Sequence, residues 1–380
     1  MQALNTTALA MLAALGLASA ASAEIRIGVT VSETGPAAFL GDPEAKTLKM
    51  MADKVNAEGG INGEEIALTL YDDGGDPNKA RTFATRLVED DEVVAIIGGT
   101  TTGTTMSIIP VVEDAEIPFI SLAGAIEIID PVKEWVFKTP HTDRMACQKI
   151  FEDMKARGIT KIGMISGTDG FGASMRKHCL EVVGDYGIEI LADESYGPTD
   201  ADMTPQLTNI KNTAGIEAVL NPGFGQGPSI VTRNYQQLAV GLPLYQSHGV
   251  ASKGFIDLAG ADAAEGVRLP GTALLVGDLL PEGDPQKPVV AAYVAEYQAA
   301  NGEAPSTFGG YAHDAFAILV DALKRAGSSD PADIRDAIEA TAGLAGTTGV
   351  VTMSKEDHLG FDLSAFRMLE IKGGDWTLTE

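Results

Sequence analysis

The strongest constraint on the fold is a regular alternation of short apolar runs with amphipathic stretches of helical period, in two successive series. The first series has expected strands at 25–29, 66–71, 93–97 and 119–120 and expected helices at 45–58, 78–90 and 107–113. The second has expected helices at 143–157, 172–186, 205–212 and 228–239 and expected strands at 161–165, 188–192, 218–220 and 244–246. Such alternation favours parallel sheets covered on both faces. A chain of 380 residues is long enough for two domains, so we predict two doubly wound α/β lobes.

The last third of the chain continues the helical pattern and then changes. Helices are expected at 288–301, 310–326 and 333–340, the last one after a start signal at Asp330 and Pro331. The tail 350–378 is expected to be rich in β-structure.

The N-terminal segment 1–23 has the pattern of a signal peptide. It carries no charged side chain, and its apolar run 8–18 is too short to span a bilayer. The segment ends in Ala21-Ser22-Ala23, which a signal peptidase accepts. We therefore expect a secreted protein whose mature chain begins at Glu24. The alternative is a buried N-terminal helix.

Charge and motifs exclude several classes of function. The net charge of −26 argues against nucleic-acid binding, which needs a basic surface. No later apolar run is long enough for a membrane span, so the mature protein is not expected to be membrane-embedded. The sequence has no Gly-x-Ser-x-Gly, Walker or His-Glu-x-x-His motif, and its five histidines share no metal-ligand spacing. We expect no enzyme activity, no cofactor and no metal.

The glycine-rich stretch 223–227 is not a convincing dinucleotide motif. Pro228 stands where the third glycine would be. A flexible loop around Phe224 is the better interpretation. The two cysteines, Cys147 and Cys179, leave two alternatives open: a disulfide in an oxidising compartment, or two buried free thiols.

Four loops that follow expected strands are candidates for ligand binding. In open α/β sheets, ligands bind beyond the carboxyl ends of the strands. The loop 98–105 is rich in Gly and Thr and opens a helix, so its free N–H groups suit a carboxylate. The alternative is a cluster that only caps that helix. The other loops are 121–125, 166–172, which contains Phe171, and 246–249, which contains His248.

Several motifs in order give the chain a family resemblance. They are Ile27-Gly28-Val29, Thr34-Gly35-Pro36, Gly41-Asp42, Asn56-Ala57-Glu58-Gly59-Gly60-Ile61-Asn62-Gly63, Tyr71-Asp72-Asp73, Asp76-Pro77, Ala95-Ile96-Ile97-Gly98, Phe171-Gly172, Ala263-Ala264-Glu265-Gly266 and Tyr311 with Asp314-Ala315. In this order and spacing the chain resembles the periplasmic leucine/isoleucine/valine-type solute-binding proteins of ABC importers, over nearly all of its mature length.

The resemblance implies two α/β lobes joined by three crossovers, which close on a ligand like a hinged clamp. The first lobe would comprise 24–141 and 273–350, and the second 142–272 and 351–380. The expected partners are a small carboxylate ligand and the permease and ATPase subunits of an importer. The protein itself is expected to be a monomer.

The same resemblance implies the site residues. A hydroxyl residue after the third strand binds the ligand carboxylate in this family, and Thr102 matches it. Backbone groups after the fourth strand bind the polar end of an amino acid, and Ala123 and Ala125 match them. The remaining candidates are an aromatic cover from the second lobe, Phe171, the first-loop residues Phe39 and Leu40, and also Gly124, Phe224 and His248.

Two departures bear on the ligand. Amino-acid binders usually have an acidic residue where His248 stands and a Thr where Ala125 stands. An ammonium buried without a partner costs several kcal/mol, whereas a His suits a carboxylate or a hydroxyl. Our hypothesis is an aromatic or short organic acid without an α-ammonium. Amino-acid binding remains the alternative, and the other classes are a sensing subunit for a chemoreceptor and a periplasmic enzyme.

Overall fold

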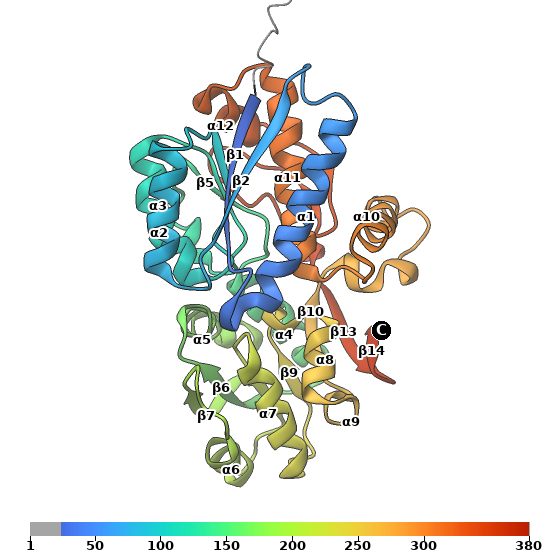
Figure 1. The fold of residues 1–380 in the computed structure, drawn as a ribbon. Coiled ribbons are helices and arrows are strands. Elements are labelled where there is room, and N and C mark those ends of the chain that lie inside the picture. The colour runs from blue at the N-terminus through green and yellow to red at the C-terminus, as the bar shows by residue number, and fades with distance from the viewer. Residues whose placement is uncertain (1–23, 380) are drawn as a thin grey trace, which may run out of the picture.

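The computed structural model describes residues 24–379 and shows two α/β lobes, one above the other in Figure 1. The signal peptide expected at 1–23 lies outside the described residues. No helix among the described residues is long and apolar enough to cross a membrane.

The first lobe is built on a parallel sheet of five strands in the order β2-β1-β3-β4-β5. These strands are β1 (Glu24–Val31), β2 (Glu65–Asp72), β3 (Ala95–Gly98), β4 (Phe119–Ser121) and β5 (Val136–Lys138). Side chains that alternate along a strand enter opposite cores. Ile96 packs in the core that includes α2 and α3, and Ile97 packs in the core that includes α1 and α11.

Helices cover both faces of this sheet, as Figure 1 shows. They are α1 (Ala38–Ala57), α2 (Pro77–Glu89), α3 (Thr102–Ala115), α11 (Thr307–Ala326) and α12 (Pro331–Glu339). The last two come from much later in the chain, and α11 packs along α1. A short ribbon of β11 (Leu344–Ala345) and β12 (Val350–Val351) follows them.

The second lobe is built on a sheet of seven strands in the order β14-β13-β10-β9-β8-β6-β7. Its parallel strands are β6 (Lys161–Gly167), β7 (Glu189–Tyr196), β8 (Ala218–Asn221), β9 (Leu244–Gln246) and β10 (Arg268–Gly271). The C-terminal hairpin of β13 (Arg367–Lys372) and β14 (Asp375–Leu378) adds the antiparallel edge.

The helices of the second lobe are α4 (Asp143–Ala156), α5 (Gly170–Val182), α6 (Thr204–Asn212), α7 (Gln226–Gln237), α8 (Lys253–Ala259) and α9 (Ala261–Ala264). Helix α10 (Gln286–Asn301) lies beside the junction of the lobes and packs on the 3-10 segment Ala273–Leu279 and on α1. A disulfide between Cys147 and Cys179 joins α4 to α5. The two sulfurs therefore form a bond and are not free thiols.

Three connections pass between the lobes: 139–142 after β5, 272–285 after β10, and 352–366 before β13. The first and third are packed against each other through His141. Its ring stacks on Phe361 and Phe366, with centroid distances of 5.1 and 4.0 Å. Burial keeps the pKa of His141 well below its usual value, so the hinge carries a neutral ring.

Several expected elements differ from the structure, and the helix expected at 45–58 begins seven residues earlier, at Ala38. The helix expected at 107–113 begins at Thr102, because the Thr101 hydroxyl accepts the N–H of Thr104 and the Thr104 hydroxyl accepts the N–H of Thr101. This capping box outweighs the low helix propensity of a Thr-rich run. The tail 350–378 is less β-rich than expected, since 352–366 is a connection with one short 3-10 turn at Leu363–Ala365.

Candidate ligand-binding site

A cavity lies between the lobes, at the carboxyl ends of strands from both sheets. The first lobe and the first connection line it with Leu40, Thr100, Thr101, Thr102, Leu122, Ala123, Gly124, Pro140, Phe308 and Tyr311. The second lobe lines it with Phe171, Phe224, His248 and Gly249. The space available to the centres of water molecules is about 40 Å³. A single water needs about 10–15 Å³ by this measure, so the cavity suits a small, compact ligand.

The N-terminus of α3 forms one end of the cavity. Thr102 is the first residue of this helix, and its N–H is one of the helix's donors without an intrahelical acceptor. The Thr102 hydroxyl oxygen is buried and has no hydrogen-bond partner in the described structure. The helix dipole adds a partial positive charge at the same place. This end of the cavity therefore suits a negatively charged group.

Aromatic rings form the walls. Phe171, in the first turn of α5, packs edge-on against Phe224 and against His248, with ring centroids 6.1 and 5.4 Å apart. Phe308 and Tyr311 come from the first turns of α11 in the other lobe. The Tyr311 hydroxyl is buried without a partner among the described residues. These walls are mainly apolar, with a few polar atoms available to orient a ligand.

At Gly124 the first lobe lies close to Phe171 and His248 of the second lobe. A Cβ on Gly124 would lie 2.8 Å from Cε2 of Phe171 and 3.2 Å from Nε2 of His248. The first distance is shorter than real Cβ contacts, so a larger residue at this position would require the Phe171 ring to shift.

His248 is buried and neutral in this arrangement. Burial, followed by the positive charge of Lys138, lowers the pKa of His248 to about 3. Its Nδ1 has no hydrogen-bond partner among the described residues. A neutral imidazole offers one donor and one acceptor, so His248 can bind a hydroxyl or a carboxylate but cannot neutralise an ammonium.

Lys138 lies directly behind the cavity wall. Its side chain is fully buried, and its Nζ donates to the carbonyl oxygens of Gly124 at 2.9 Å and Ala125 at 3.3 Å. Burial lowers the pKa of Lys138 to about 7, against the opposing effect of Asp143 and Glu127. The carbonyls after β4 therefore already accept hydrogen bonds from a protein cation.

The described lining of the cavity contains no Asp or Glu side chain. Glu44, on α1, lies one layer behind the lining and accepts a hydrogen bond from the Thr100 hydroxyl at 2.5 Å. Burial raises the pKa of Glu44 well above its usual value, which favours the uncharged form of this carboxyl group. No negative charge thus faces the cavity from its lining.

Comparison with known proteins identifies the family. A family model described as periplasmic binding protein matches residues 24–375. The chain belongs to this family. Its fold is that of the type I periplasmic binding proteins of the leucine/isoleucine/valine-binding kind, and like its relatives it is a solute-binding protein rather than an enzyme.

Individual relatives are similar over nearly the whole chain. The chain is 25% identical over 353 residues to the leucine-, isoleucine-, valine-, threonine-, and alanine-binding protein of Pseudomonas aeruginosa, covering 92% of this chain and 91% of the relative. An extracellular ligand-binding receptor from Rhodopseudomonas palustris has a TM-score of 0.88 at 30% identity, with 94% of this chain and 100% of that chain covered. A branched-chain amino acid transporter substrate-binding protein from Streptococcus pneumoniae, solved with isoleucine, has a TM-score of 0.83 at 23% identity over 94% of this chain and 99% of that chain, which shows likeness of fold alone.

Most of the expected site residues of this periplasmic binding protein lie together around the cavity. Those that line it are Leu40, Thr102, Ala123, Gly124, Phe171, Phe224 and His248. Two do not line it. The Phe39 ring packs on Phe308, with centroids 5.8 Å apart, because the turn of α1 directs Leu40 inward instead. Ala125 is fully buried in the apolar core behind the wall.

Sequence reasoning missed Lys138, Phe308 and Pro140. Lys138 ends a strand of three residues that has too few positions to show a period. Phe308 follows the N-cap Ser306, whose hydroxyl accepts the N–H of Gly309. A Ser before an apolar helix is a readable start signal, so this cap could have placed Phe308 and Tyr311 at the end of α11 that faces the ligand.

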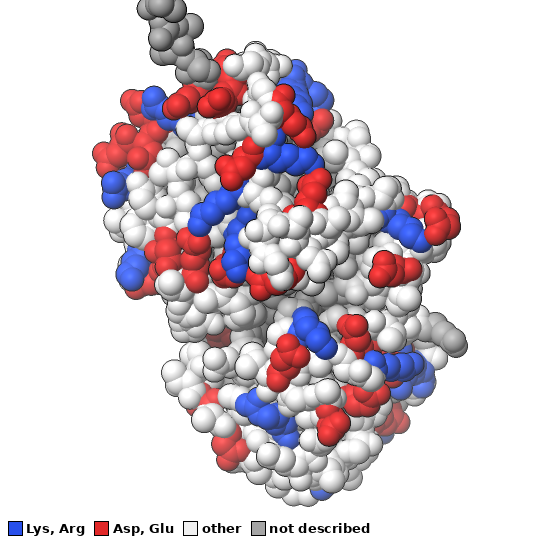
Figure 2. Space-filling view, turned by 45° about the vertical axis from the view of Figure 1, so that its right-hand side comes forward, with Lys and Arg blue, Asp and Glu red and all other residues white. Residues whose placement is uncertain are grey.

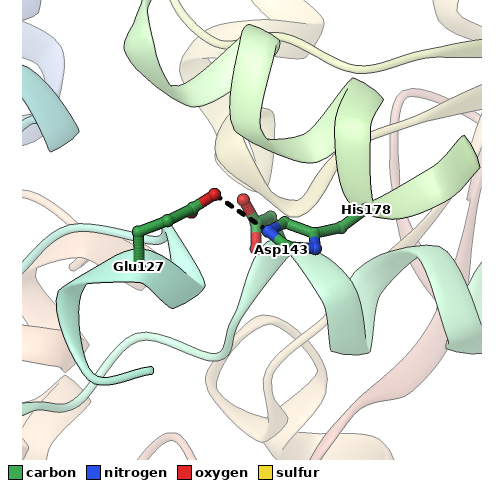
Figure 3. A group of neighbouring side chains, drawn as sticks. All are labelled: Glu127, Asp143 and His178. Carbon is green, nitrogen blue, oxygen red and sulfur yellow. Dashed lines mark hydrogen bonds and ion pairs between the residues drawn. The ribbon is translucent and has the colours of Figure 1, made fainter. Parts of the chain in front are cut away.

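A second polar cluster lies at the junction of the lobes, outside the cavity lining (Figure 3). It joins Glu127 of the first lobe, in the 3-10 turn Ile126–Ile128, to His178 on α5 and to Asp143 at the start of α4. One ligand-type atom from each residue lies within 4.8 Å of the others, a grouping able to hold a metal ion. These residues are far apart in sequence, so no motif indicates their proximity.

Proposed function

We propose that this protein is the substrate-binding component of an ABC importer and captures a small carboxylate-bearing solute that lacks an α-ammonium. The favoured ligand class is an aromatic or short organic acid. The ligand carboxylate would lie at the N-terminus of α3, and its apolar part would lie among the aromatic rings.

The absence of a carboxylate from the described cavity lining is the observation that carries this proposal. An amino acid brings an ammonium that needs a negative or strongly accepting partner, and leaving it unpaired costs several kcal/mol. The carbonyl oxygens of Gly124 and Ala125 accept from Lys138. While Lys138 is protonated, a second cation beside these carbonyl oxygens would be repelled.

The unpartnered polar atoms support the same ligand chemistry. The Thr102 hydroxyl, Nδ1 of His248 and the Tyr311 hydroxyl are buried in residues of the cavity lining and have no partner among the described residues. Buried polar groups are normally hydrogen-bonded. A carboxylate, or a carboxylate with a ring hydroxyl, supplies the acceptors and donor that these groups lack.

The test uses ligand pairs that differ only in the ammonium. Phenylalanine is paired with 3-phenylpropanoate and leucine with 4-methylpentanoate, and binding is measured by titration calorimetry and thermal shift on the mature protein. We expect the acid of at least one pair to bind and its amino acid to bind at least tenfold more weakly, a difference of about 1.4 kcal/mol. Tighter binding of leucine or phenylalanine would refute the proposed ligand class.

Amino-acid import is the second candidate, because the Pseudomonas aeruginosa relative is named for binding leucine, isoleucine, valine, threonine and alanine. The two candidates share the transport role and differ in the charge of the bound solute. For either candidate, we propose that the mature protein acts as a monomer in the periplasm and delivers its ligand to permease and ATPase subunits. Loss of uptake of the bound compound on deletion of the gene tests this role.

The substitution His248→Asp is predicted to reduce or abolish the preference for the acid within each pair. A carboxylate at this position would pair with an ammonium and repel the ligand's own carboxylate. We expect the affinity ratio of amino acid to acid to rise about tenfold or more, which calorimetry measures directly. His248→Asn is the matched control, since it keeps a neutral polar group and should retain the acid preference.

A further inference from the structure

Helix α5 presents one side of its surface to Glu127 of the opposite lobe. The Ser174 hydroxyl lies between Oε2 of Glu127, at 2.6 Å, and Oδ2 of Asp143, and Nζ of Lys177 donates to Oε1 of Glu127 at 3.0 Å. Nε2 of His178 lies 3.0 Å from the same Oε1 (Figure 3). Residues three and four apart share a helix face, so three polar groups of the second lobe converge on one carboxylate of the first.

The same helix reaches the ligand cavity and the disulfide. Its first turn supplies Phe171 to the cavity wall, and Cys179 bonds it to Cys147 of α4. A helix is stiff along its axis, so the position of Phe171 over a ligand depends on where the rest of α5 is held. Glu127 therefore contacts the element that covers the ligand without itself lining the cavity.

The contact between Glu127 and α5 keeps the Glu127 carboxylate charged. The His178 side chain is 3% exposed and that of Glu127 is 34% exposed. Burial alone would raise the pKa of Glu127, but hydrogen bonds from Ser174, Lys177 and His178 outweigh burial and lower the pKa to about 2. The carboxylate is thus charged throughout the neutral range.

We infer that Glu127 is a positioning residue for ligand retention: by binding Ser174, Lys177 and His178 across the lobe junction, it holds α5, and with it Phe171, in the closed position over the cavity. The interaction adds to whatever the ligand contributes to closure, because it lies outside the cavity. It sets how long a ligand stays, whereas the cavity lining sets which ligand is bound.

The alternative occupant of this cluster is a divalent cation held by Glu127, Asp143 and His178. Two protein cations already contact this cluster. Nζ of Lys177 forms an ion pair with Glu127, and Nη2 of Arg144 lies 3.1 Å from Nδ1 of His178. Nδ1 of His178 also lies 2.7 Å from Oε2 of Glu181, so both ring nitrogens of His178 and Oε1 of Glu127 already have protein partners. The structure therefore favours a protein contact between the lobes over a metal site.

The test compares two substitutions that each remove one carboxylate contact to α5. Glu127→Gln removes the contact between the lobes. Asp193→Asn is the matched control, because Asp193 forms an ion pair with Arg176 of α5 within the second lobe. Stopped flow follows the dissociation of leucine or of 3-phenylpropanoate, depending on which of the two the protein binds. Lobe separation is followed by spin labels at Glu89→Cys and Asp185→Cys, both exposed positions on different lobes.

We expect Glu127→Gln to raise the dissociation rate constant about tenfold with the association rate constant within about twofold, and to reduce the population with the shorter label distance. Asp193→Asn should change neither. A double-mutant cycle of Glu127→Gln with Lys177→Met should show non-additive effects on dissociation. This expectation concerns closure and is the same for an acid or an amino acid, so it fails independently of the proposed ligand class.

Three outcomes would overturn the inference. One is an unchanged label distance distribution in Glu127→Gln with an unchanged dissociation rate. Another is an equal effect of Asp193→Asn, which would indicate general loosening of α5. The third is stabilisation of the wild type by equimolar zinc chloride that Glu127→Gln abolishes, which would make the cluster a metal site.

Discussion

At the scale of single residues, the site is governed by buried groups whose charge state differs from that in water. His248 lies on the cavity wall and is neutral, burial favours the uncharged form of Glu44 behind Thr100, and Lys138 is the buried base behind Gly124. Desolvation causes all three shifts, and it favours the uncharged form of each group. The charge close to the cavity therefore depends on the protonation of Lys138, a residue that does not line the cavity.

Lys138→Met is predicted to change the pH dependence of stability. The folded-state pKa of Lys138 is about 7 and its ordinary value is 10.5. Between these values the unfolded chain binds a proton that the folded chain does not, so this group makes the free energy of unfolding rise with pH, by at most about 1.4 kcal/mol per pH unit. Urea unfolding at several pH values in this window should show that slope in the wild type and its loss in the variant.

The exposed Lys155→Met serves as the control and should leave the slope unchanged. Ligand affinity measured at several pH values tests the same residue. Because protonated Lys138 favours an anion nearby, acid binding should weaken as pH rises through 7, and Lys138→Met should bind the acid more weakly at pH 6. An affinity for the acid that is equal at pH 6 and pH 9 would contradict the role given to Lys138.

At the scale of elements, the sequence predicted most of the long helices and several strands, including the short ones at 119–120, 218–220 and 244–246, but it missed other short strands and some helix starts. The expected helices at 78–90 and 205–212 agree with α2 and α6 within a residue. Strands β5 and β10, of three and four residues, were not expected. The early start of α3 was missed because the reciprocal capping by Thr101 and Thr104 is a matter of side-chain geometry.

Part of the candidate site could also be predicted from the sequence. Loops after strands could be located from the strand pattern and the edge rule for parallel sheets. Thr102, Gly124, Phe171 and His248 line the cavity, and their role in ligand binding stays a prediction. Phe308 reaches it from a helix that begins nearly 170 residues after β5, and only tertiary packing brings it there.

The disulfide between α4 and α5 is predicted to stabilise the second lobe. The cysteines are 32 residues apart, and the loop-closure model gives about 3–4 kcal/mol for a loop of this length. The double substitution Cys147→Ser with Cys179→Ser should lower the free energy of unfolding by about this amount in urea. A reducing agent should destabilise the wild type similarly and leave the double variant unchanged; an unaffected wild type would refute the prediction.

At the scale of the whole molecule, two lobes, each built from separate parts of the chain, enclose the site. The chain carries a large negative charge. Basic side chains on the face in Figure 2 lie among acidic ones and form no continuous positive area. The net charge of −26 belongs wholly to the chain after residue 23, since the first 23 residues have no charged side chain. An anionic ligand therefore approaches against the overall field and is bound by local groups at the cavity.

This field predicts a specific salt dependence. The Debye length falls from about 30 Å at 0.01 M salt to about 8 Å at 0.15 M. The association rate constant of an acid should therefore rise several-fold over this range, and that of a neutral amide analogue should stay constant. A rate constant for the acid that falls with salt would mean that a local positive potential dominates its approach.

The arrangement of α11 on the first sheet has a consequence for the order in which the protein can fold during synthesis. The five strands of that sheet are complete at Lys138, but the helix that buries one of its apolar faces begins at Thr307. A ribosome must add about 170 further residues, including most of the second lobe, before that face can be fully covered. Throughout that interval α1 covers this face without α11, so part of the apolar surface around Ile27, Val29 and Ile97 stays open to any partner that binds apolar surface. We therefore expect this topology to need either a holding chaperone or folding that is delayed until the chain is released.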